Sequence, residues 1–226
     1  MITIEGPPRW ALRTPWVFRY LEKANVDAFF ATGELYLSSF ANFKKADDAQ
    51  RKDGKEGYNA FFHVNHANGG QTLAVFADYG KDAYVLCGSL KGSSGLKEVF
   101  GRDDGIVIKN TVGFAQAVAK MVPGFRHGLE GACTYSDIKG EVRDFGYQDW
   151  EVKLPDGRIT YDAVKAQKVI DSFVTEDMFF TKEASYFSQA EYRLLWFTDR
   201  EITSGIKIVV PEARQYCRRF AEIVLK

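Results

Sequence analysis

The sequence predicts a single α+β domain in which helices flank a split, mainly antiparallel sheet. Short segments rich in aromatic and β-branched residues recur along the chain, as is typical of strands. Several are separated by glycine-containing turns that suit hairpins, and segments with helical spacing lie between others. No repeat, low-complexity tract or shift in composition marks a boundary, so we expect one domain over residues 1–226.

The first elements are expected to form a strand, a helix and a second strand. Residues 1–15 are rich in proline and predict an irregular N-terminal arm. Arg19 interrupts the aromatic run of the first strand, so an inward-pointing side chain there needs an anion or a carboxylate. The helix should end at Gly33 in a left-handed cap. The second strand closes on Ser38 and Ser39, and short connections bring this end close to Arg19.

The remaining elements follow from the same patterns. Glycine-containing turns at residues 68–70 and 79–82 separate three strands and predict a meander. Thr111 is expected to cap a helix, Asp156-Gly157 to form a turn, and Pro211 to begin a closing helix. The expected strands cover residues 16–20, 35–39, 58–64, 72–77, 83–86, 105–109, 126–135, 192–197 and 206–210. The expected helices cover residues 22–32, 96–100, 112–122, 163–173 and 212–225.

The composition indicates a globular protein with a substantial core, since 46% of the residues are hydrophobic and 15% aromatic. The 30 basic residues balance 30 acidic ones, so no overall field attracts nucleic acid or anionic lipid, although a local basic groove is compatible with this balance. The three cysteines are odd in number and widely spaced, which indicates reduced core residues. We find no signal peptide or membrane span, and we expect a cytoplasmic protein without a membrane partner.

Several common functional motifs are absent from the sequence. It has no G-x-x-x-x-G-K phosphate loop, no Rossmann glycine run after a strand and no G-x-S-x-G elbow. His63 and His66 are close in sequence, but their spacing at a strand end directs them to different faces. With no cysteine beside them, no metal site is predicted, and three histidines in all leave little room for a histidine-based triad.

Polar residues gather where a buried strand is expected to begin. Gln189 and Glu191 precede an apolar run ending at Phe197, and on an extended chain both side chains point to one face. Arg193 shares that face and is an alternative, purely structural partner for Glu191. This strand entry is therefore either one corner of a site or an ordinary solvated strand end.

The layout of these residues resembles that of ADP-ribosyltransferases. Arg19 lies on a first strand, the Ser38-Ser39 pair ends a second strand, and Gln189-x-Glu191 opens a late strand. In place of the Ser-Thr-Ser motif common in that superfamily the chain has Leu37-Ser38-Ser39, which leaves the assignment open between the two serines. An aromatic turn often precedes the Gln-x-Glu pair, and Tyr186-Phe187 is a loose equivalent.

This resemblance implies an ADP-ribosyltransferase-like fold and NAD as the cofactor. Glu191 is implied to be catalytic, because a carboxylate stabilises the positive charge that develops on the ribose, with Ser38 and Gln189 as further catalytic residues. Arg19 is implied to bind the pyrophosphate. The implied cofactor-binding residues are Arg19, Tyr20 and Ser39.

The chain also resembles, over most of its length, a family of bacterial domains of unknown function. This resemblance identifies relatives but implies no activity. It rests on Phe18-Arg19-Tyr20, Leu37-Ser38-Ser39-Phe40, Phe43, Arg51-x-Asp53-x-x-Glu56-Gly57, Leu86-Cys87-Gly88-Ser89, Gly105-Ile106-Val107-Ile108, and Lys182 through Glu191-Tyr192-Arg193.

The implied reaction is transfer of ADP-ribose from NAD to a macromolecule. A neutral amide at Gln189 favours an amide, a thiol or a nucleobase over a guanidinium as the acceptor. Arg51, Asp53 and Glu56 are expected either to bind the acceptor or simply to form part of a solvated loop over residues 46–57. In bacteria such an enzyme would act as a toxin or a phage-defence effector, with an antitoxin or regulatory protein as a partner.

Two functions of other classes remain open from the sequence. The first is a non-catalytic module on the same fold that senses a nucleotide or nucleic acid, because a fold does not fix an activity. The second is an accessory protein that binds a partner through the charged loop 44–57 and the basic closing helix. Hydrolysis of the dinucleotide is also open as an alternative to transfer.

Overall fold

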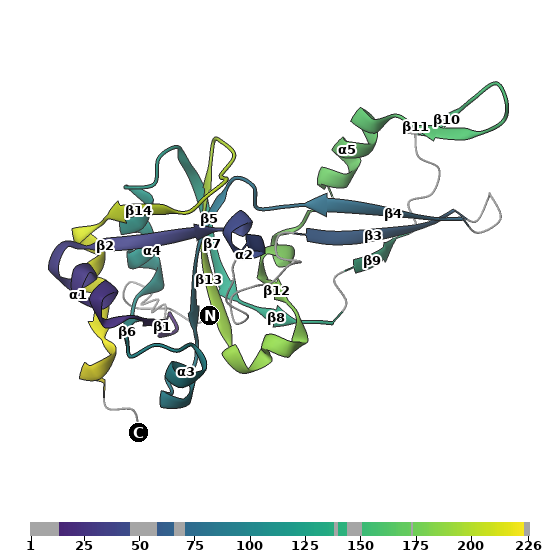
Figure 1. Cartoon of the computed structure of the whole chain (residues 1–226). Coiled ribbons are helices and arrows are strands. Elements are labelled where there is room, and N and C mark those ends of the chain that lie inside the picture. The colour runs from purple at the N-terminus through teal and green to yellow at the C-terminus, as the bar shows by residue number, and fades with distance from the viewer. Residues whose placement is uncertain are drawn as a thin grey trace, which may run out of the picture.

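The computed structural model describes residues 14–45, 58–65, 71–137, 140–143, 151–172 and 174–223. Within these residues eight strands form the main sheet, in which every pairing is antiparallel. Its central strands are β1 (Val17–Leu21), β5 (Ala83–Ser89) and β13 (Glu191–Thr198). The predicted α+β class, with one domain and a mainly antiparallel sheet, is confirmed (Figure 1).

The other strands of the main sheet are β2 (Glu34–Ser39), β6 (Asp104–Ile108), β7 (Phe125–Ala132), β14 (Ile206–Val209) and β15 (Cys217–Arg219). Strands outside it are β3 (Tyr58–Asn65) and β4 (Gln71–Asp78) with β9 (Gly140–Arg143), β8 (Thr134–Tyr135) with β12 (Thr181–Lys182), and β10 (Glu151–Lys153) with β11 (Ile159–Tyr161). The α-helices are α1 (Lys23–Thr32), α2 (Phe40–Lys45), α3 (Ser94–Val99), α4 (Thr111–Ala119) and α5 (Ala163–Ser172). Short 3-10 helices cover Glu176–Phe180, Ala184–Gln189, Pro211–Tyr216 and Phe220–Glu222.

Strand β13 is buried along its whole length, and its alternating side chains enter two different parts of the core. Leu194 and Trp196 pack on one face with side chains of α1 and α4. Leu195 and Phe197 pack on the other face with Phe179. The sheet is therefore covered on both sides, which explains why residues 194–197 of β13 are all apolar rather than alternating with polar residues.

The main sheet is split next to β5. Strand β2 pairs with the beginning of β5, Ser38 opposite Val85, whereas β1 pairs with its end, Phe18 opposite Ser89. Both strands therefore lie along the same edge of β5 and separate from each other between these two contacts. Figure 1 shows β2 and β1 at different heights along β5. This opening leaves the middle of β5, including Cys87, between the two diverging strands.

The helix caps are partly as predicted. Helix α1 ends at Gly33, which adopts φ 85° and donates its backbone N–H to the Phe29 carbonyl, as the left-handed cap requires. Thr111 is not the cap of α4; the Asn110 side chain accepts from the Gly113 N–H at 2.9 Å. Thr111 is instead buried and donates its hydroxyl to Glu130.

Two expected elements are wrong. The predicted meander of three strands is not formed, because β4 pairs with β3 while β5 joins the main sheet. Over the described part of residues 212–225, the expected closing helix is replaced by two 3-10 helices, Pro211–Tyr216 and Phe220–Glu222, and by β15 between them, which pairs with β6. Cys217 of β15 and Phe220 at the start of the next 3-10 helix are buried, and pairing with β6 satisfies backbone groups that a helix would leave at the sheet edge.

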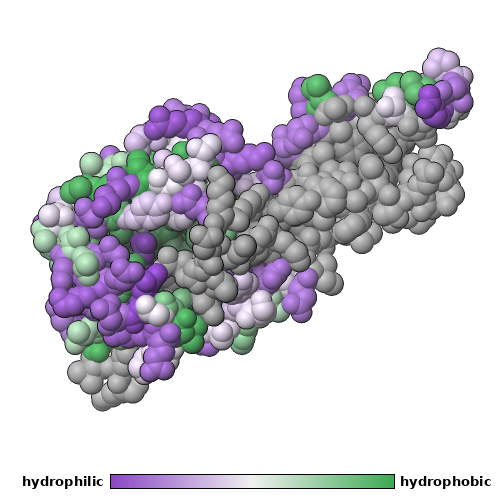
Figure 2. Space-filling view, in the orientation of Figure 1, coloured by the Kyte–Doolittle hydropathy of each residue, from purple (hydrophilic) through white to green (hydrophobic). Residues whose placement is uncertain are grey.

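Some expectations lie outside the described residues, namely residues 1–13 of the N-terminal arm and the charged loop 46–57. No described helix has the length and apolar character needed to span a membrane. Figure 2 shows hydrophilic residues over most of the described surface of the main body on this face, with hydrophobic residues in smaller groups between them.

Candidate active site

A cavity of about 640 Å³ lies where β1 and β2 separate from each other along β5. Its lining includes Arg19 and Tyr20 of β1, Ser38 of β2, and Gln189 with Glu191 at the start of β13. Five of the predicted site residues thus line one space. The volume lies within the range of small-molecule and cofactor pockets.

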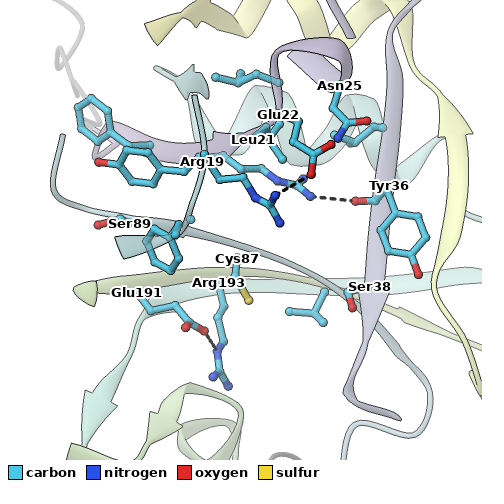
Figure 3. A pocket seen from close by; sticks show the side chains of 18 of the residues that line it. Arg19, Leu21, Glu22, Asn25, Tyr36, Ser38, Cys87, Ser89, Glu191 and Arg193 are labelled. Carbon is cyan, nitrogen blue, oxygen red and sulfur yellow. Dashed lines mark hydrogen bonds and ion pairs between the residues drawn. The ribbon is translucent and has the colours of Figure 1, made fainter. Parts of the chain in front are cut away.

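Glu191 is almost completely buried and is bound by two basic side chains. Its Oε1 accepts from Arg193 Nε at 2.6 Å, and its Oε2 forms a short ion pair with Lys182 Nζ. The side chains of Lys182 and Arg193 are themselves buried, at 7% and 1% exposure. The alternative in which Arg193 neutralises Glu191 is confirmed, and Lys182 is a second partner (Figure 3 shows the Arg193 pair).

The two cations keep the Glu191 carboxylate ionised. Burial by itself raises the pKa of this carboxyl group, but attraction to Arg193 and Lys182 and the hydrogen bonds they donate outweigh burial and lower the pKa from 4.5 to about 2. Glu191 in turn raises the pKa of the Lys182 ammonium against the opposing effect of burial. All three groups are therefore charged at neutral pH, and the cluster carries one net positive charge.

The prediction that Gln189 lies on an extended strand with Glu191 is wrong. Gln189 is the last residue of a 3-10 helix, and Ala190 follows with φ 44° and ψ 53° before β13 begins at Glu191. This left-handed residue turns the chain, so strand alternation does not relate the two side chains. Both nevertheless reach Lys182, whose Nζ lies 3.0 Å from Gln189 Oε1.

Backbone hydrogen bonds hold this turn against the neighbouring strands. The Glu191 N–H donates to the Tyr135 hydroxyl at 2.6 Å, and the Glu191 carbonyl accepts from the Cys133 N–H at 2.8 Å. On the other side, the Ser89 hydroxyl donates to the Gln189 carbonyl at 2.6 Å. Residues of β5 and of the segment around β8 thus fix where the Glu191 carboxylate lies.

Arg19 extends from β1 across the opening of the sheet. Its Nη2 donates to the backbone carbonyl of Tyr36 on β2, at 3.2 Å (Figure 3). Tyr20 lines the same cavity, but its hydroxyl donates to the Lys91 carbonyl at 2.7 Å and accepts from the Ser93 N–H at 3.0 Å. In this structure Tyr20 therefore anchors the loop that follows β5.

The two candidate serines have different surroundings. Ser38 lines the cavity and is half-buried, and in the described part of the chain its hydroxyl has no hydrogen-bond partner. Ser39 is fully buried, does not line the cavity, and accepts from the Asn42 N–H at 3.2 Å at the start of α2. Ser39 thus caps the start of α2, and Ser38 is the serine that lines the cavity and is available to a ligand.

The described lining of the cavity has more positive than negative charge. Five basic residues face three carboxylates, which leaves a formal charge of +2. The basic residues are Arg19, Arg102, Lys182, Arg193 and Lys207, and the acidic ones are Glu22, Glu34 and Glu191. Such a cavity favours an anionic ligand, because the field of cations is strengthened between low-dielectric walls.

Three predicted residues, Arg51, Asp53 and Glu56, lie outside the described residues. Two residues of the site were not predicted as functional, Lys182 and Arg102. Lys182 lies two residues after the apolar pair Phe179-Phe180, and a cation this close to an apolar segment is compatible with a buried partner but does not identify it. Arg102 lies in a charged turn, where the sequence offers no comparable signal.

The three cysteines are free, as predicted. Cys133 and Cys217 are buried, whereas Cys87 is half-buried and lines the cavity. Burial raises the pKa of Cys87 well above its ordinary value and that of Cys217 to about 12. These thiols are therefore neutral at physiological pH, which does not favour a nucleophilic role.

The cavity thus combines cations that can hold an anionic ligand with an ionised carboxylate that can stabilise a positive charge. Comparison of the chain with protein-family models, with curated proteins and with solved structures finds no match.

Proposed function

We propose that this chain binds NAD in the cavity between β1 and β2 and transfers ADP-ribose to a macromolecular acceptor, a nucleic-acid base or a protein side chain. The observation that supports the proposal is that Arg19, Ser38 and Glu191, on three different strands, line the same cavity. The resemblance in sequence assigns these three residues to one site, and the ADP-ribosyltransferase-like fold is part of the same proposal.

The proposed chemistry uses the charges found in the cavity. Breaking the bond between nicotinamide and ribose develops positive charge on the sugar, and Glu191 is ionised at any pH well above its pKa of about 2. A carboxylate beside the ribose stabilises the transition state more than the ground state. Ser38 offers a hydroxyl to the nicotinamide end, and Arg19 offers planar donors to the pyrophosphate.

Lys182 and Arg193 have a positioning role in this proposal. Each holds one oxygen of the Glu191 carboxylate, so the group is fixed in orientation before a substrate arrives. Preorganised groups stabilise a transition state without having to rearrange during the reaction. Transfer of this kind inside a bacterium would make the chain a toxin or a phage-defence effector under the control of a partner protein.

One observation favours a second function, in which the cavity binds a nucleotide without catalysis. The Glu191 carboxylate is already paired with two cations, and the cluster carries a net positive charge. This arrangement weakens the stabilisation that Glu191 can offer to a positively charged sugar, whereas it strengthens the binding of an anion. A nucleotide-sensing module therefore requires no further change to the cavity.

Incubation of the purified protein with cell lysate and NAD labelled on the adenine tests the proposal. We expect wild-type protein to place label on a macromolecule and Glu191→Gln to lower the rate at least about 100-fold, the scale of losing one electrostatic catalytic group. Glu130→Gln is the matched control, because it neutralises a partly buried carboxylate on the neighbouring strand β7 outside the cavity.

The assay separates the two functions. Equal labelling by wild type and by Glu191→Gln, with both proteins folded, contradicts the catalytic role of Glu191. Retained binding of NAD without label transfer or nicotinamide release, across lysates of different origin, supports the nucleotide-sensing module instead.

A further inference from the structure

We propose that Arg102 binds a phosphate group of the ligand in the cavity, and that the cavity selects ligands that carry a diphosphate. This inference deepens the proposed function and rests on it, since it names the group by which the dinucleotide would be held. The sequence patterns assigned no role to Arg102, which follows α3 and precedes β6.

Arg102 is a largely buried cation at the cavity wall. It lines the same space as Arg19, and its side chain is 18% exposed. Its Nη1 donates to Glu22 Oε1 at 2.6 Å, while its buried Nε has no hydrogen-bond partner among the described residues. Buried N–H groups are nearly always satisfied, so an unsatisfied one at a cavity wall indicates a missing acceptor.

The partner of Arg102 is easily replaced. The Glu22 side chain is 61% exposed, and an ion pair with so exposed a carboxylate is weak because water solvates the carboxylate nearly as well. A phosphate that enters the cavity can take the place of Glu22, which then returns to solvent. Figure 3 shows Glu22 and Arg19 at the same end of the pocket, so a phosphate there meets both guanidinium groups.

Two guanidinium groups from separate segments match a ligand with two adjacent phosphates. Arg19 comes from the central strand β1, and Arg102 from the turn between α3 and β6. A guanidinium group binds phosphate oxygens through paired, charge-assisted hydrogen bonds. A diphosphate can engage both groups, a monophosphate has fewer oxygens for them, and a nucleoside has none.

Calorimetric titration of the whole chain with ADP, AMP and adenosine tests the inference, with wild type, Arg102→Met and Glu22→Gln compared. We expect wild type to bind ADP at least about tenfold more tightly than AMP, since each charge-assisted contact contributes on that scale. Arg102→Met should weaken the binding of ADP about tenfold and leave the affinity for adenosine unchanged. Glu22→Gln should raise the affinity for ADP about threefold, because the carboxylate that competes with phosphate for Arg102 is gone.

Opposite effects of the two variants on ADP are the signature of the inference. Equal affinity for AMP and ADP overturns diphosphate selection. If each variant changes the affinities for ADP and for adenosine by the same factor, Arg102 and Glu22 are only a structural pair. If thermal unfolding shows that Arg102→Met does not fold, the test rests on Glu22→Gln. Unchanged or weaker binding of ADP by Glu22→Gln then overturns the proposal. Tight ADP binding without NAD turnover overturns catalysis alone, whereas NAD turnover that is indifferent to Arg102→Met overturns this inference alone.

Discussion

Glu191 is the residue on which the site depends, because it is a buried carboxylate that faces a cavity and is bound by two buried cations. Ion pairs of this kind contribute less to stability than their contacts suggest, since three charges lose their hydration. Removing one partner is nevertheless costly, because it leaves the others buried and unpaired. The cluster therefore serves to hold the carboxylate ionised and oriented rather than to maximise stability.

The stability of the protein should depend on Glu191 in acid. The pKa of this carboxyl group is lowered from 4.5 to about 2 on folding, so the unfolded chain binds the proton more readily between these two values. The contribution of Glu191 to the free energy of unfolding, roughly 3 kcal/mol, is complete above about pH 4.5 and is lost as the pH falls towards 2. Urea unfolding at a series of pH values measures this change.

Glu191→Gln supplies the control for that measurement. The pKa values of Asp27 and Asp156 are also lowered, chiefly by hydrogen bonds from Lys23 and Arg158, and both groups remain in the variant. Subtracting the two pH profiles isolates Glu191. If wild type and variant lose stability in parallel between pH 5 and 2, the pKa of Glu191 is not lowered on folding.

At the scale of elements, the turn at Ala190 decides how the Glu191 carboxylate is presented. Among the described residues, Ala190 is the one residue other than glycine with a positive φ. It ends the 3-10 helix Ala184–Gln189 and lets β13 begin immediately afterwards. Such a conformation costs an L-residue about 1–2 kcal/mol. It persists because the next residue, Glu191, is held in place: its N–H donates to the Tyr135 hydroxyl, and its carbonyl accepts from the Cys133 N–H.

Substitutions at residue 190 should show how much the left-handed backbone conformation costs in free energy of unfolding, and how that cost depends on the side chain. Ala190→Gly removes the steric cost but adds freedom to the unfolded chain, so the free energy of unfolding should stay the same or rise by up to about 1 kcal/mol. Ala190→Val should lower it by about 1–2 kcal/mol, because a β-branched residue fits this region poorly. Chemical denaturation measures both, and a valine variant as stable as wild type contradicts the left-handed turn.

The elements show which patterns predict structure in this chain. The aromatic and branched runs predicted β1, β2, β5 and β13, and Gly33 predicted the end of α1, because these signals act over a few residues. The closing segment was predicted as a helix, since its basic residues and Pro211 suit one, but pairing with β6 makes residues 217–219 a strand. Gln189 and Glu191 were expected on one face, and the turn at Ala190 cannot be inferred from a residue that is not glycine.

For the whole molecule, the split of the main sheet creates the site. Strands β1 and β2 lie along one edge of β5 and diverge, so the cavity opens between them and reaches the start of β13. The order of Arg19, Ser38 and Glu191 in the sequence suggested a common site, and all three line the cavity. Lys182 could not be assigned to it, because the parallel pairing of β12 with β8 brings it there.

Filling the cavity from β2 should block the ligand without unfolding the protein. Ser38→Phe places an aromatic ring beside a space of about 640 Å³, and the wild-type hydroxyl has no partner among the described residues to lose. We expect the free energy of unfolding to change by less than about 1 kcal/mol and binding of ADP-ribose to weaken at least about tenfold. Calorimetry measures the binding.

Val209→Phe provides the matched control for this variant. Val209 is exposed on β14, the neighbour of β2, and does not line the cavity. The control should bind ADP-ribose like wild type. Unchanged binding by Ser38→Phe would mean that the ligand does not occupy the space between β1 and β2.

The proposed function places NAD in the split between β1 and β2, with its pyrophosphate near Arg19 and its nicotinamide ribose near Glu191. A crystal structure of the chain with NAD or ADP-ribose at saturating concentration tests this claim most directly. We expect a ligand that contacts Arg19, Ser38 and Glu191 within hydrogen-bond distance. A ligand bound elsewhere, or an empty cavity at a concentration that saturates binding in solution, would contradict it.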